Sequence, residues 1–338
     1  MRAEIAEQPD AVARTLARLR PEMPELRRLV ASCRHVLLLA RGSSDNAAVY
    51  AQYACSTRGR RLATLGSPSL ATAYRAEVDL HGVLAVGVSQ SGATEEIVDA
   101  LAWAARSGAA TLAVTNDPAS PLAARADLAL VTDAGSERAV PATKTYTTQL
   151  TALAVLAEAL AGEDGTGRLD LVPPEMARML ETAAEAERVA GLLVDAERLV
   201  VTGRGFTAST AYEIALKLTE TCHVTALGLS YGDLLHGPIA AVDEGTPVLV
   251  AAPREGPVLP GLADLARRLH STGTRVYGIG GDASLTEHCD AALPGPSLPE
   301  DLAPLALVVP GQLVAEALAR AKGLDPDVPR GLGKVTQT

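Results

Sequence analysis

The sequence predicts an α/β protein of two tandem domains, each a parallel sheet flanked by helices in a three-layer sandwich. Short apolar runs alternate with amphipathic segments along the chain, which is typical of a parallel sheet covered on both faces. The length of 338 residues suits about two such domains. Blocks of the first half also recur in the second half at a nearly constant offset, which indicates a duplicated unit.

Composition argues against several classes of protein. Hydrophobic residues make up 48% of the chain and charged residues 21%, so each domain can bury a core. The formal net charge of −10 argues against a nucleic-acid partner. We expect neither a signal peptide nor a membrane span, because no unbroken apolar run reaches about 18 residues. The four cysteines fall in no metal-binding or redox spacing, so we expect a cytoplasmic protein without a metal site.

The first domain is expected to follow a helical segment. Residues 1–29 carry leucines at helical spacing, interrupted by Pro21 and Pro24, and are too few for a DNA-binding domain. Residues 34–40 (RHVLLLA) predict a buried strand, which runs into the turn Arg41-Gly42-Ser43-Ser44 and a helix through about Cys55. The first domain is placed at 30–162.

The stretch 83–94, VLAVGVSQSGAT, combines a strand, a turn and the start of a helix. The turn has three hydroxyl groups and lies where unpaired backbone N–H groups and the positive end of the helix dipole point outward. Such a turn suits a phosphate group, although an ordinary loop with a serine cap would have a similar composition. The polar side chains of the turn are Ser89, Gln90, Ser91 and Thr94.

The remainder of the first domain leads into a linker. Strands are predicted at 111–115 and 128–132, and a long helix from 143 to about 160. Residues 162–174 (GEDGTGRLDLVPP) are rich in Gly, Pro and charge, and a helix is predicted from 174 to 193. We therefore place the linker and its helix at 163–187, the second domain at 188–323 and a tail at 324–338.

The second domain repeats the first. Three blocks of the first half align with the second half, and the offset between them changes by only a residue or two, which predicts a duplicated α/β unit. The second copy has Pro253-Arg254-Glu255-Gly256 in place of the serine-rich turn, so we expect one phosphate site per chain, in the first half. The aligned blocks are 36–48 with 199–211, 83–92 with 248–256, and 111–117 with 275–282, at offsets of 163 to 165 residues.

The helix predicted from 207 to 222 carries a row of charge. Glu213, Lys217 and Glu220 fall at i, i+4 and i+7. This spacing favours a solvated face with Glu–Lys pairs. The alternative is a carboxylate–ammonium–carboxylate row in which one Glu moves protons. The turn before the helix matches the loose dinucleotide fingerprint G-x-G-x-x-A. No acidic residue ends the next strand, so nicotinamide binding is not expected.

A histidine and a lysine fall outside the predicted helices and strands. His236 precedes Gly237-Pro238 in a loop, where a catalytic and an idle exposed histidine are equally expected. A final strand is predicted at 305–309 and a final helix at 311–322. The tail beyond them carries Lys334. Two prolines stiffen the tail, so it can fold back over a site, the alternative being a floppy terminus.

Seven motifs, in one order and over nearly the whole chain, resemble the sugar isomerase (SIS) domain family. The resemblance is to the isomerase half of glucosamine-6-phosphate synthase and to its relatives without a glutaminase domain. The motifs are MRAEIAEQP (1–9), RGSS (41–44), SQSGAT (89–94), ERAVPATKTYTTQL (137–150), YEIALKLTE (212–220), YGDLLHGP (231–238) and DPDVPRGLGKVT (325–336).

The resemblance implies two tandem SIS domains of flavodoxin-like topology, without a cofactor, and a role for each matching residue. Glu220 would move a proton between C1 and C2 of the sugar, with Lys217 and Glu213 beside it. His236 would open the sugar ring, reaching in from the neighbouring subunit of a homodimer, and Lys334 would meet the sugar carbonyl. The residues implied to bind the sugar phosphate are Ser43, Ser44, Ser89, Gln90, Ser91, Thr94, Val140 and Ala142.

Two positions depart from the synthase pattern. Arg41 stands where the synthase has Cys, and Ala142 where it has Ser, so the amine-bearing end of the substrate is expected to be recognised differently. The implied chemistry is proton transfer between adjacent sugar carbons through an enediol or enolamine. It needs a base that works near neutral pH, which a carboxylate partly withdrawn from water can provide, and no metal or redox cofactor.

The resemblance leaves the reaction direction and three functions to consider. We expect no glutaminase domain, because the chain starts Met1-Arg2 and lacks an N-terminal cysteine nucleophile. Without ammonia supplied through a tunnel, dilution favours its release, which predicts conversion of glucosamine 6-phosphate and water to fructose 6-phosphate and ammonia. The alternatives are a deglycase that cleaves fructosamine 6-phosphates and a non-catalytic sugar-phosphate sensor. Sensors of this family usually carry a helix-turn-helix domain, for which residues 1–29 are too few.

Overall fold

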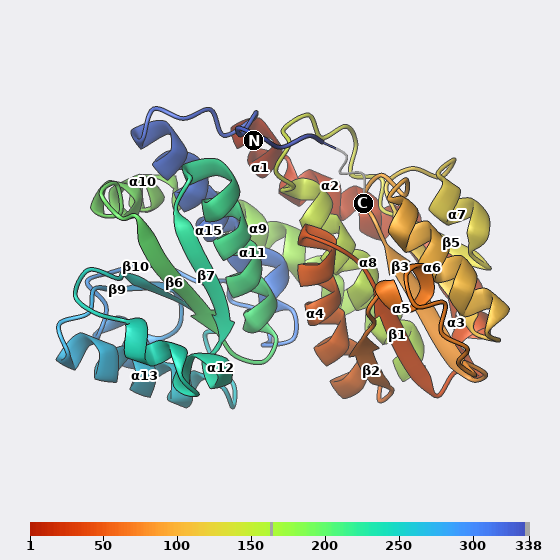
Figure 1. Ribbon diagram of the computed structural model, residues 1–338. Helices are drawn as coiled ribbons and strands as arrows, with labels where there is room; N and C mark the ends of the chain where they lie inside the picture. The colour runs from red at the N-terminus through yellow and green to blue at the C-terminus, as the bar shows by residue number, and fades with distance from the viewer. Residues whose placement is uncertain (163–164, 335–338) are drawn as a thin grey trace. The chain divides into compact units, whose positions relative to one another are not determined.

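The computed structural model describes residues 1–162 and 165–334, and Figure 1 shows its helices and strands. The chain forms two compact units. The N-terminal unit comprises 10–137, 144–170 and the chain from Gly333 onward. The C-terminal unit comprises 1–9, 138–143 and 171–332. Each unit contains one sheet.

The N-terminal unit is built on a five-stranded parallel sheet in the order β2-β1-β3-β4-β5. Its central strands are buried and rich in Val, Leu and Ala, as expected of strands covered on both faces. Helices follow the strands in turn and supply that cover. The strands are β1 (His35–Leu39), β2 (Leu62–Leu65), β3 (Val83–Val88), β4 (Ala110–Thr115) and β5 (Leu128–Val131). The helices are α2 (Gln8–Leu19), η1 (Arg20–Glu22), α3 (Met23–Val30), α4 (Ser43–Thr57), α5 (Ser69–Thr72), α6 (Glu95–Arg106), α7 (Pro121–Arg125), α8 (Lys144–Ala161) and η2 (Gly165–Leu171).

The strand order creates a topological switch point between β1 and β3. These two strands are neighbours, with Leu39 paired to Gly87, yet the chain leaves β1 for β2 on the other side. In open parallel sheets ligands bind outside the carboxyl ends of the strands at such a point. Arg41 follows Leu39 by two residues and Ser89 follows Gly87 by two, so both predicted turns begin at the carboxyl ends of these strands.

The C-terminal unit has a second five-stranded parallel sheet, in the order β10-β9-β8-β6-β7. When β6 is matched to β1, β7 corresponds to β2 and β8, β9 and β10 correspond to β3, β4 and β5. The two sheets therefore have the same strand order, which confirms the predicted duplication. The strands are β6 (Arg198–Gly203), β7 (Thr225–Ser230), β8 (Val248–Ala252), β9 (Val276–Gly280) and β10 (Ala291–Leu293). The helices are α1 (Arg2–Ala6), α9 (Val172–Leu180), α10 (Ala183–Leu192), α11 (Thr207–Cys222), α12 (Tyr231–Leu235), η3 (Pro238–Ala241), α13 (Leu259–Ser271), α14 (Ala283–Thr286) and α15 (Ala303–Ala321).

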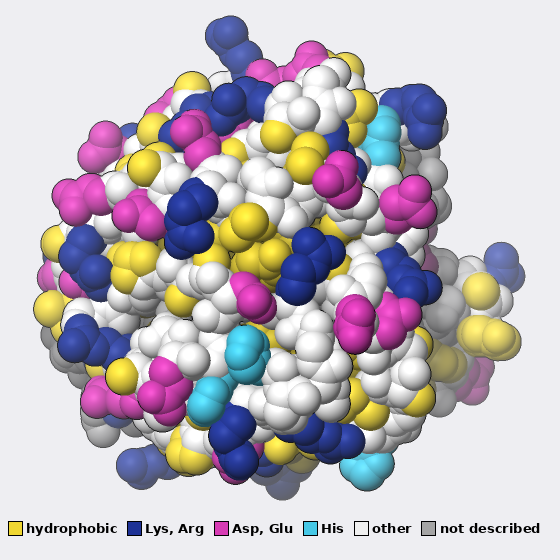
Figure 2. Space-filling view, turned by 90° about the vertical axis from the view of Figure 1, so that its left-hand side faces the viewer, with side chains coloured by type: hydrophobic (Ala, Val, Ile, Leu, Met, Phe, Trp, Pro, Cys, Tyr) yellow, Lys and Arg dark blue, Asp and Glu magenta, His cyan; other side chains and the backbone are white. Residues whose placement is uncertain are grey.

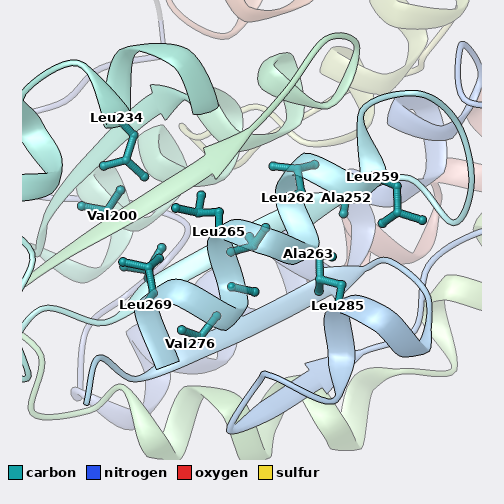
Figure 3. Packing of buried hydrophobic residues seen from close by; sticks show 13 residues of the cluster. Val200, Leu234, Ala252, Leu259, Leu262, Ala263, Leu265, Leu269, Val276 and Leu285 are labelled. Carbon is teal, nitrogen blue, oxygen red and sulfur yellow. The ribbon is translucent and has the colours of Figure 1, made fainter. Parts of the chain in front are cut away.

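One core of the C-terminal unit lies between α13 and the sheet (Figure 3). Leu262, Leu265 and Leu269 recur along one face of α13 and are buried with Val250 and Val276 of the strands beneath. A leucine buried in this way contributes about 1.5–3 kcal/mol relative to an exposed one. The matching core of the N-terminal unit packs Leu101 and its neighbours on α6 against β3 and β4. Away from the cores, acidic and basic side chains are interspersed on the face drawn in Figure 2.

The strand predicted at 305–309 is wrong, because these residues lie inside the helix α15. α15 packs on α9, α10 and α11 and is buried on nearly all sides, so its apolar run has no helical periodicity to reveal it. Pro310 lies within the same helix. Among the described helices, α15 has the length and composition to cross a membrane, but 94% of that window is buried in the protein.

Three smaller predictions also differ from the structure. The helix expected from 174 to 193 is two helices, α9 and α10, separated at Glu181 and Thr182. The edge strands β2 and β10 were not predicted, because they have only four and three residues, too few for an apolar pattern to be recognised. The helical character expected of residues 1–29 is confirmed by α1, α2, η1 and α3.

Glu300 provides a test of pH-dependent stability in the C-terminal unit. Burial raises the pKa of its carboxyl group, and the neighbouring Asp301 raises it further. The folded protein therefore binds this proton more tightly than the unfolded chain, and the associated stability is lost as pH rises through the raised pKa. We expect Glu300→Gln to raise Tm by about one or two degrees at pH 7 and by less near pH 4. Thermal unfolding at both pH values, with the exposed Glu255→Gln as control, measures this; an equal gain at the two pH values contradicts it.

Candidate functional site

Hydrogen bonds within the serine-rich turn of the N-terminal unit, and from the turn to a neighbouring strand, fix its backbone. The Ser89 hydroxyl accepts from Gly92 N at 3.2 Å and lies 3.2 Å from the hydroxyl of Thr94. The carbonyl of Gln90 accepts from the backbone of Asn116, which ties the turn to the end of β4. The Gln90 and Ser91 side chains are partly exposed, and Thr94 is the N-cap of α6 without capping through its side chain. Ser89 is buried, so the turn presents the hydroxyl groups of Ser91 and Thr94 and the first N–H groups of α6 at the switch point.

The second predicted turn, at the end of β1, lies at the same edge. Gly42 adopts φ of +59° and is the N-cap of α4, which begins at Ser43. The buried Gln149 on α8 donates to the Ser44 hydroxyl at 3.0 Å, so Ser44 is fixed from beneath. Ser43 and Ser44 are both partly exposed.

Charged groups flank these turns. Arg41 donates from Nε and Nη2 to the two carboxylate oxygens of Glu96, at 2.9 and 3.0 Å. Burial raises the pKa of Asp45, in the first turn of α4, and the charge of Arg41 opposes that rise. The guanidinium thus offsets two carboxylates near the turns.

The tail lysine is anchored within the N-terminal unit. Lys334 Nζ donates to Oε2 of Glu137 at 3.0 Å. Glu137 is buried, and its carboxylate also accepts from the backbone N–H and the hydroxyl of Thr145. This contact holds the tail at Lys334 beside a residue 197 positions earlier in the chain. Its last residues, 335–338, lie outside the described part of the chain.

The charged row on α11 lies inside the C-terminal unit. Lys217 Nζ is 2.6 Å from Oε2 of Glu220 and 3.4 Å from Oε1 of Glu213. The side chains of Lys217 and Glu213 have no exposed area, whereas 21% of the Glu220 side chain is exposed. A solvated helix face is thereby excluded. The arrangement is a buried ion-paired row in which only the last carboxylate reaches solvent.

Glu220 and His236 lie at opposite ends of the strands of one sheet. α11 starts just after the carboxyl end of β6 and runs back, so Glu220 in its last turn lies near the start of β7. The six residues of β7 then return the chain to the carboxyl ends of the strands, about 20 Å away. There the exposed His236 is the C-cap of α12. The structure therefore does not bring these two groups together within one C-terminal unit.

The segment 138–143 belongs to the C-terminal unit and carries Val140 and Ala142, both partly exposed. Val140 N donates to the carbonyl of Asp327 at 2.9 Å, and Ala139 N donates to the Glu4 carboxylate. Helix α1 and the tail thus brace the backbone on which these two predicted substrate contacts lie.

The model of the SIS domain family matches residues 29–159 and again residues 192–319. The chain belongs to the SIS domain family. The two matches coincide with the two sheets, and the paired strand orders are those of a tandem SIS protein.

Relatives of this SIS-domain protein include larger enzymes. It is 34% identical over 342 residues to the isomerizing glutamine–fructose-6-phosphate aminotransferase of Methanothermobacter thermautotrophicus, covering 99% of this chain and 56% of the relative. The Thermococcus kodakarensis aminotransferase gives 34% over 347 residues, with 99% and 57% covered. The chain thus spans about half the length of the curated relatives it matches.

Solved structures match over almost their whole length. The C-terminal domain of the Francisella tularensis glucosamine-fructose-6-phosphate aminotransferase has a TM-score of 0.89 at 28% identity, with 96% of this chain and 97% of that chain covered. A phosphosugar isomerase structure from Silicibacter pomeroyi has a TM-score of 0.87 at 34% identity, with 97% and 99% covered. The Thermotoga maritima glucosamine-6-phosphate deaminase shares the fold, with a TM-score of 0.77 at 23% identity over 96% and 99% of the two chains.

Two residues with clear structural roles in this SIS-domain protein were not predicted. Glu137 anchors Lys334, and Gln149 fixes Ser44. Both lie in the motif ERAVPATKTYTTQL, which supported the resemblance, but neither stands at a spacing that indicates its partner. The partners are 197 and 105 residues away along the chain, so only the fold reveals them.

Gly92 is expected to be essential to the shape of the serine-rich turn. It has φ of +60°, and a Cβ there would lie 2.2 Å from the hydroxyl oxygen of Ser120 and 2.8 Å from that of Thr115. Gly92→Ala should therefore lower the free energy of unfolding by about 2–4 kcal/mol. Gly323→Ala is the control for backbone strain, because Gly323 also has a positive φ, of +71°, with open space around it, and should cost about 1 kcal/mol. Urea denaturation measures both variants; equal losses would contradict a steric role.

Proposed function

We propose that this protein is an amino-sugar-phosphate deaminase and isomerase that converts glucosamine 6-phosphate and water to fructose 6-phosphate and ammonia. The observation that carries the proposal is the row on α11, in which a buried ammonium and a buried carboxylate support one accessible carboxylate. A protein that only binds a sugar has no need to bury two charges at this expense, because desolvated ions cost several kcal/mol each. A base held in this way suits proton transfer.

The proposed reaction gives separate roles to the residues named above. The turns at 41–44 and 89–94 hold the phosphate group through hydroxyl groups and helix N-termini. Glu220 removes the proton from C2 of the open-chain amino sugar and returns it to C1, while O1 gains a proton and the amine loses one. The 2-amino aldehyde thereby becomes a 1-hydroxy-2-imine. Water adds to the imine carbon and ammonia leaves, giving the ketose. Lys334 donates to the sugar carbonyl, and His236 donates a proton to the ring oxygen as the ring opens.

The direction follows from mass action. When ammonia is not delivered from another site, water is in large excess over ammonia, and release is favoured. The protein names of the relatives are consistent with this chemistry, since they include an aminotransferase that isomerises fructose 6-phosphate and a glucosamine-6-phosphate deaminase.

A coupled assay of ammonia release tests the proposal. Purified protein is given glucosamine 6-phosphate, galactosamine 6-phosphate or a fructosamine 6-phosphate, and ammonia is followed through glutamate dehydrogenase. Release from a hexosamine phosphate, absent in Glu220→Gln, supports a deaminase, whereas cleavage of the fructosamine phosphate alone supports the deglycase. Binding without release from any substrate, with the wild-type protein and Glu220→Gln behaving alike, would leave only the sensor.

We further propose that the site is completed by a second copy of the chain, which supplies His236. The separation of Glu220 and His236 within one unit supports this arrangement. Mixing inactive Glu220→Gln with inactive His236→Ala tests it. In a heterodimer one of the two sites then receives both intact residues, so activity should recover to about one quarter of the wild-type value. No recovery after verified subunit exchange would place both groups in the same chain.

A further inference from the structure

Arg41 lies at the edge of the sheet where the proposed phosphate site is found. The parallel register of β1 and β3 pairs Leu39 with Gly87, so Arg41 and Ser89 leave their strands at the same level. The Arg41 side chain is 46% exposed. It is not among the side chains that the proposed reaction uses.

The helix that would receive the phosphate begins with two acidic residues. Glu95 and Glu96 form the first turn of α6, directly after the serine-rich turn. Carboxylates here stabilise a helix, because they face the positive end of its dipole. For the same reason they compete with any other anion at these N–H groups, and a doubly charged phosphate is repelled by them most.

Arg41 neutralises one of these carboxylates with a geometry that fixes both partners. Its Nε and Nη2 each donate to a different oxygen of Glu96, and Glu96 is only 15% exposed. A bidentate pair of this kind is stronger and more directional than a single contact. The positive charge of Arg41 also acts on Asp45 at the start of α4. One guanidinium therefore offsets acids at the N-termini of both helices that flank the turns.

We propose that Arg41 is a specificity-determining residue of the phosphate site. By cancelling the charge of Glu96, and in part that of Asp45, it allows the 89–94 turn to accept a phosphate dianion. The proposal rests on the proposed function, since it assigns the phosphate group of the substrate to this turn. It predicts an asymmetry. Loss of Arg41 exposes the ligand to uncompensated carboxylates, whereas loss of the Glu96 charge breaks the same ion pair without adding repulsion.

Calorimetric titration of the full chain with fructose 6-phosphate tests the asymmetry. Arg41→Ala should weaken binding by about 10- to 50-fold, whereas Glu96→Gln should bind as tightly as the wild-type protein or slightly more tightly. The double variant should return to within about threefold of the wild-type value, and adding Asp45→Asn should recover most of the remainder. Fructose 6-sulfate, a singly charged analogue, should lose less than fructose 6-phosphate on Arg41→Ala. Arg106→Ala, which removes an exposed arginine from the last turn of the same helix, is the control for net charge and should bind like the wild-type protein.

The outcomes separate this inference from the proposed function. Equal losses in Arg41→Ala and Glu96→Gln, with no recovery in the double variant, would show that the pair only holds the turn and would overturn the inference. Equal sensitivity of the phosphate and the sulfate to Arg41→Ala would do the same. A wild-type protein that binds no sugar phosphate would instead overturn the proposed function.

Discussion

Glu220→Gln is expected to lower kcat for ammonia release by about 10³-fold, the effect typical of losing a general base. Glutamine keeps the size of the side chain and its contact with Lys217, which lies 2.6 Å from the carboxylate, but it cannot accept a proton. KM should change little, because the proposed phosphate contacts lie on other residues. Steady-state kinetics on glucosamine 6-phosphate, with thermal unfolding to verify the fold, measures the effect.

The matched control is Glu185→Gln on α10, an exposed glutamate, which should keep wild-type kcat. Proton exchange at C2 gives an independent measure. Wild-type protein should wash solvent deuterium into the substrate and Glu220→Gln should not. A Glu220→Gln variant that keeps more than a tenth of the wild-type rate would remove Glu220 from the proton-transfer step.

Lys217→Met is expected to lower the free energy of unfolding by about 3–5 kcal/mol at pH 7. Lys217 has no exposed side-chain area and pairs with two carboxylates, one of which, Glu213, is equally buried. Removal of the ammonium leaves a buried carboxylate without its compensating charge. Since the stability of a domain is typically about 5–15 kcal/mol, this is a large fraction of the total. Urea denaturation monitored by circular dichroism measures the loss.

A double variant distinguishes charge from packing in this prediction. Glu213→Gln combined with Lys217→Met removes the stranded carboxylate and should recover at least half of the lost stability. Lys322→Met is the control, because Lys322 is partly exposed and donates only to a backbone carbonyl, and should cost less than about 1 kcal/mol. If Lys217→Met and the double variant are equally destabilised, the loss comes from packing and not from the uncompensated charge.

Prediction from sequence succeeded where a local pattern has one structural explanation. The strand–turn–helix units at 34–55 and 83–106 and the repeated blocks have the expected elements, and both sheets have the same order. It failed at 305–309, because a run of apolar residues is compatible with a buried strand and with a helix buried on all sides. The edge strand β2 was missed because four residues are too few for an apolar pattern to be recognised.

The candidate site shows the same division. The hydroxyl groups at 89–94 were found from sequence, because residues next to each other in a turn must lie together. The spacing of Glu213, Lys217 and Glu220 favoured a solvated face over a catalytic row, and the burial of Glu213 and Lys217 excludes the solvated face. The Arg41–Glu96 pair joins the turn after β1 to the first turn of the helix α6, 55 residues later, and was not predicted.

The sequence by itself determined the duplicated α/β architecture, the family and the two turns at the switch point, since these depend on periodicity and on neighbours along the chain. Only the tertiary structure decided which charges are buried, which acids Arg41 neutralises and where Lys334 is anchored. Those properties depend on contacts between distant segments and on the exclusion of water, which no local pattern encodes. The same reason explains why Glu220 and His236, only 16 residues apart in sequence, lie at opposite ends of the strands of one sheet.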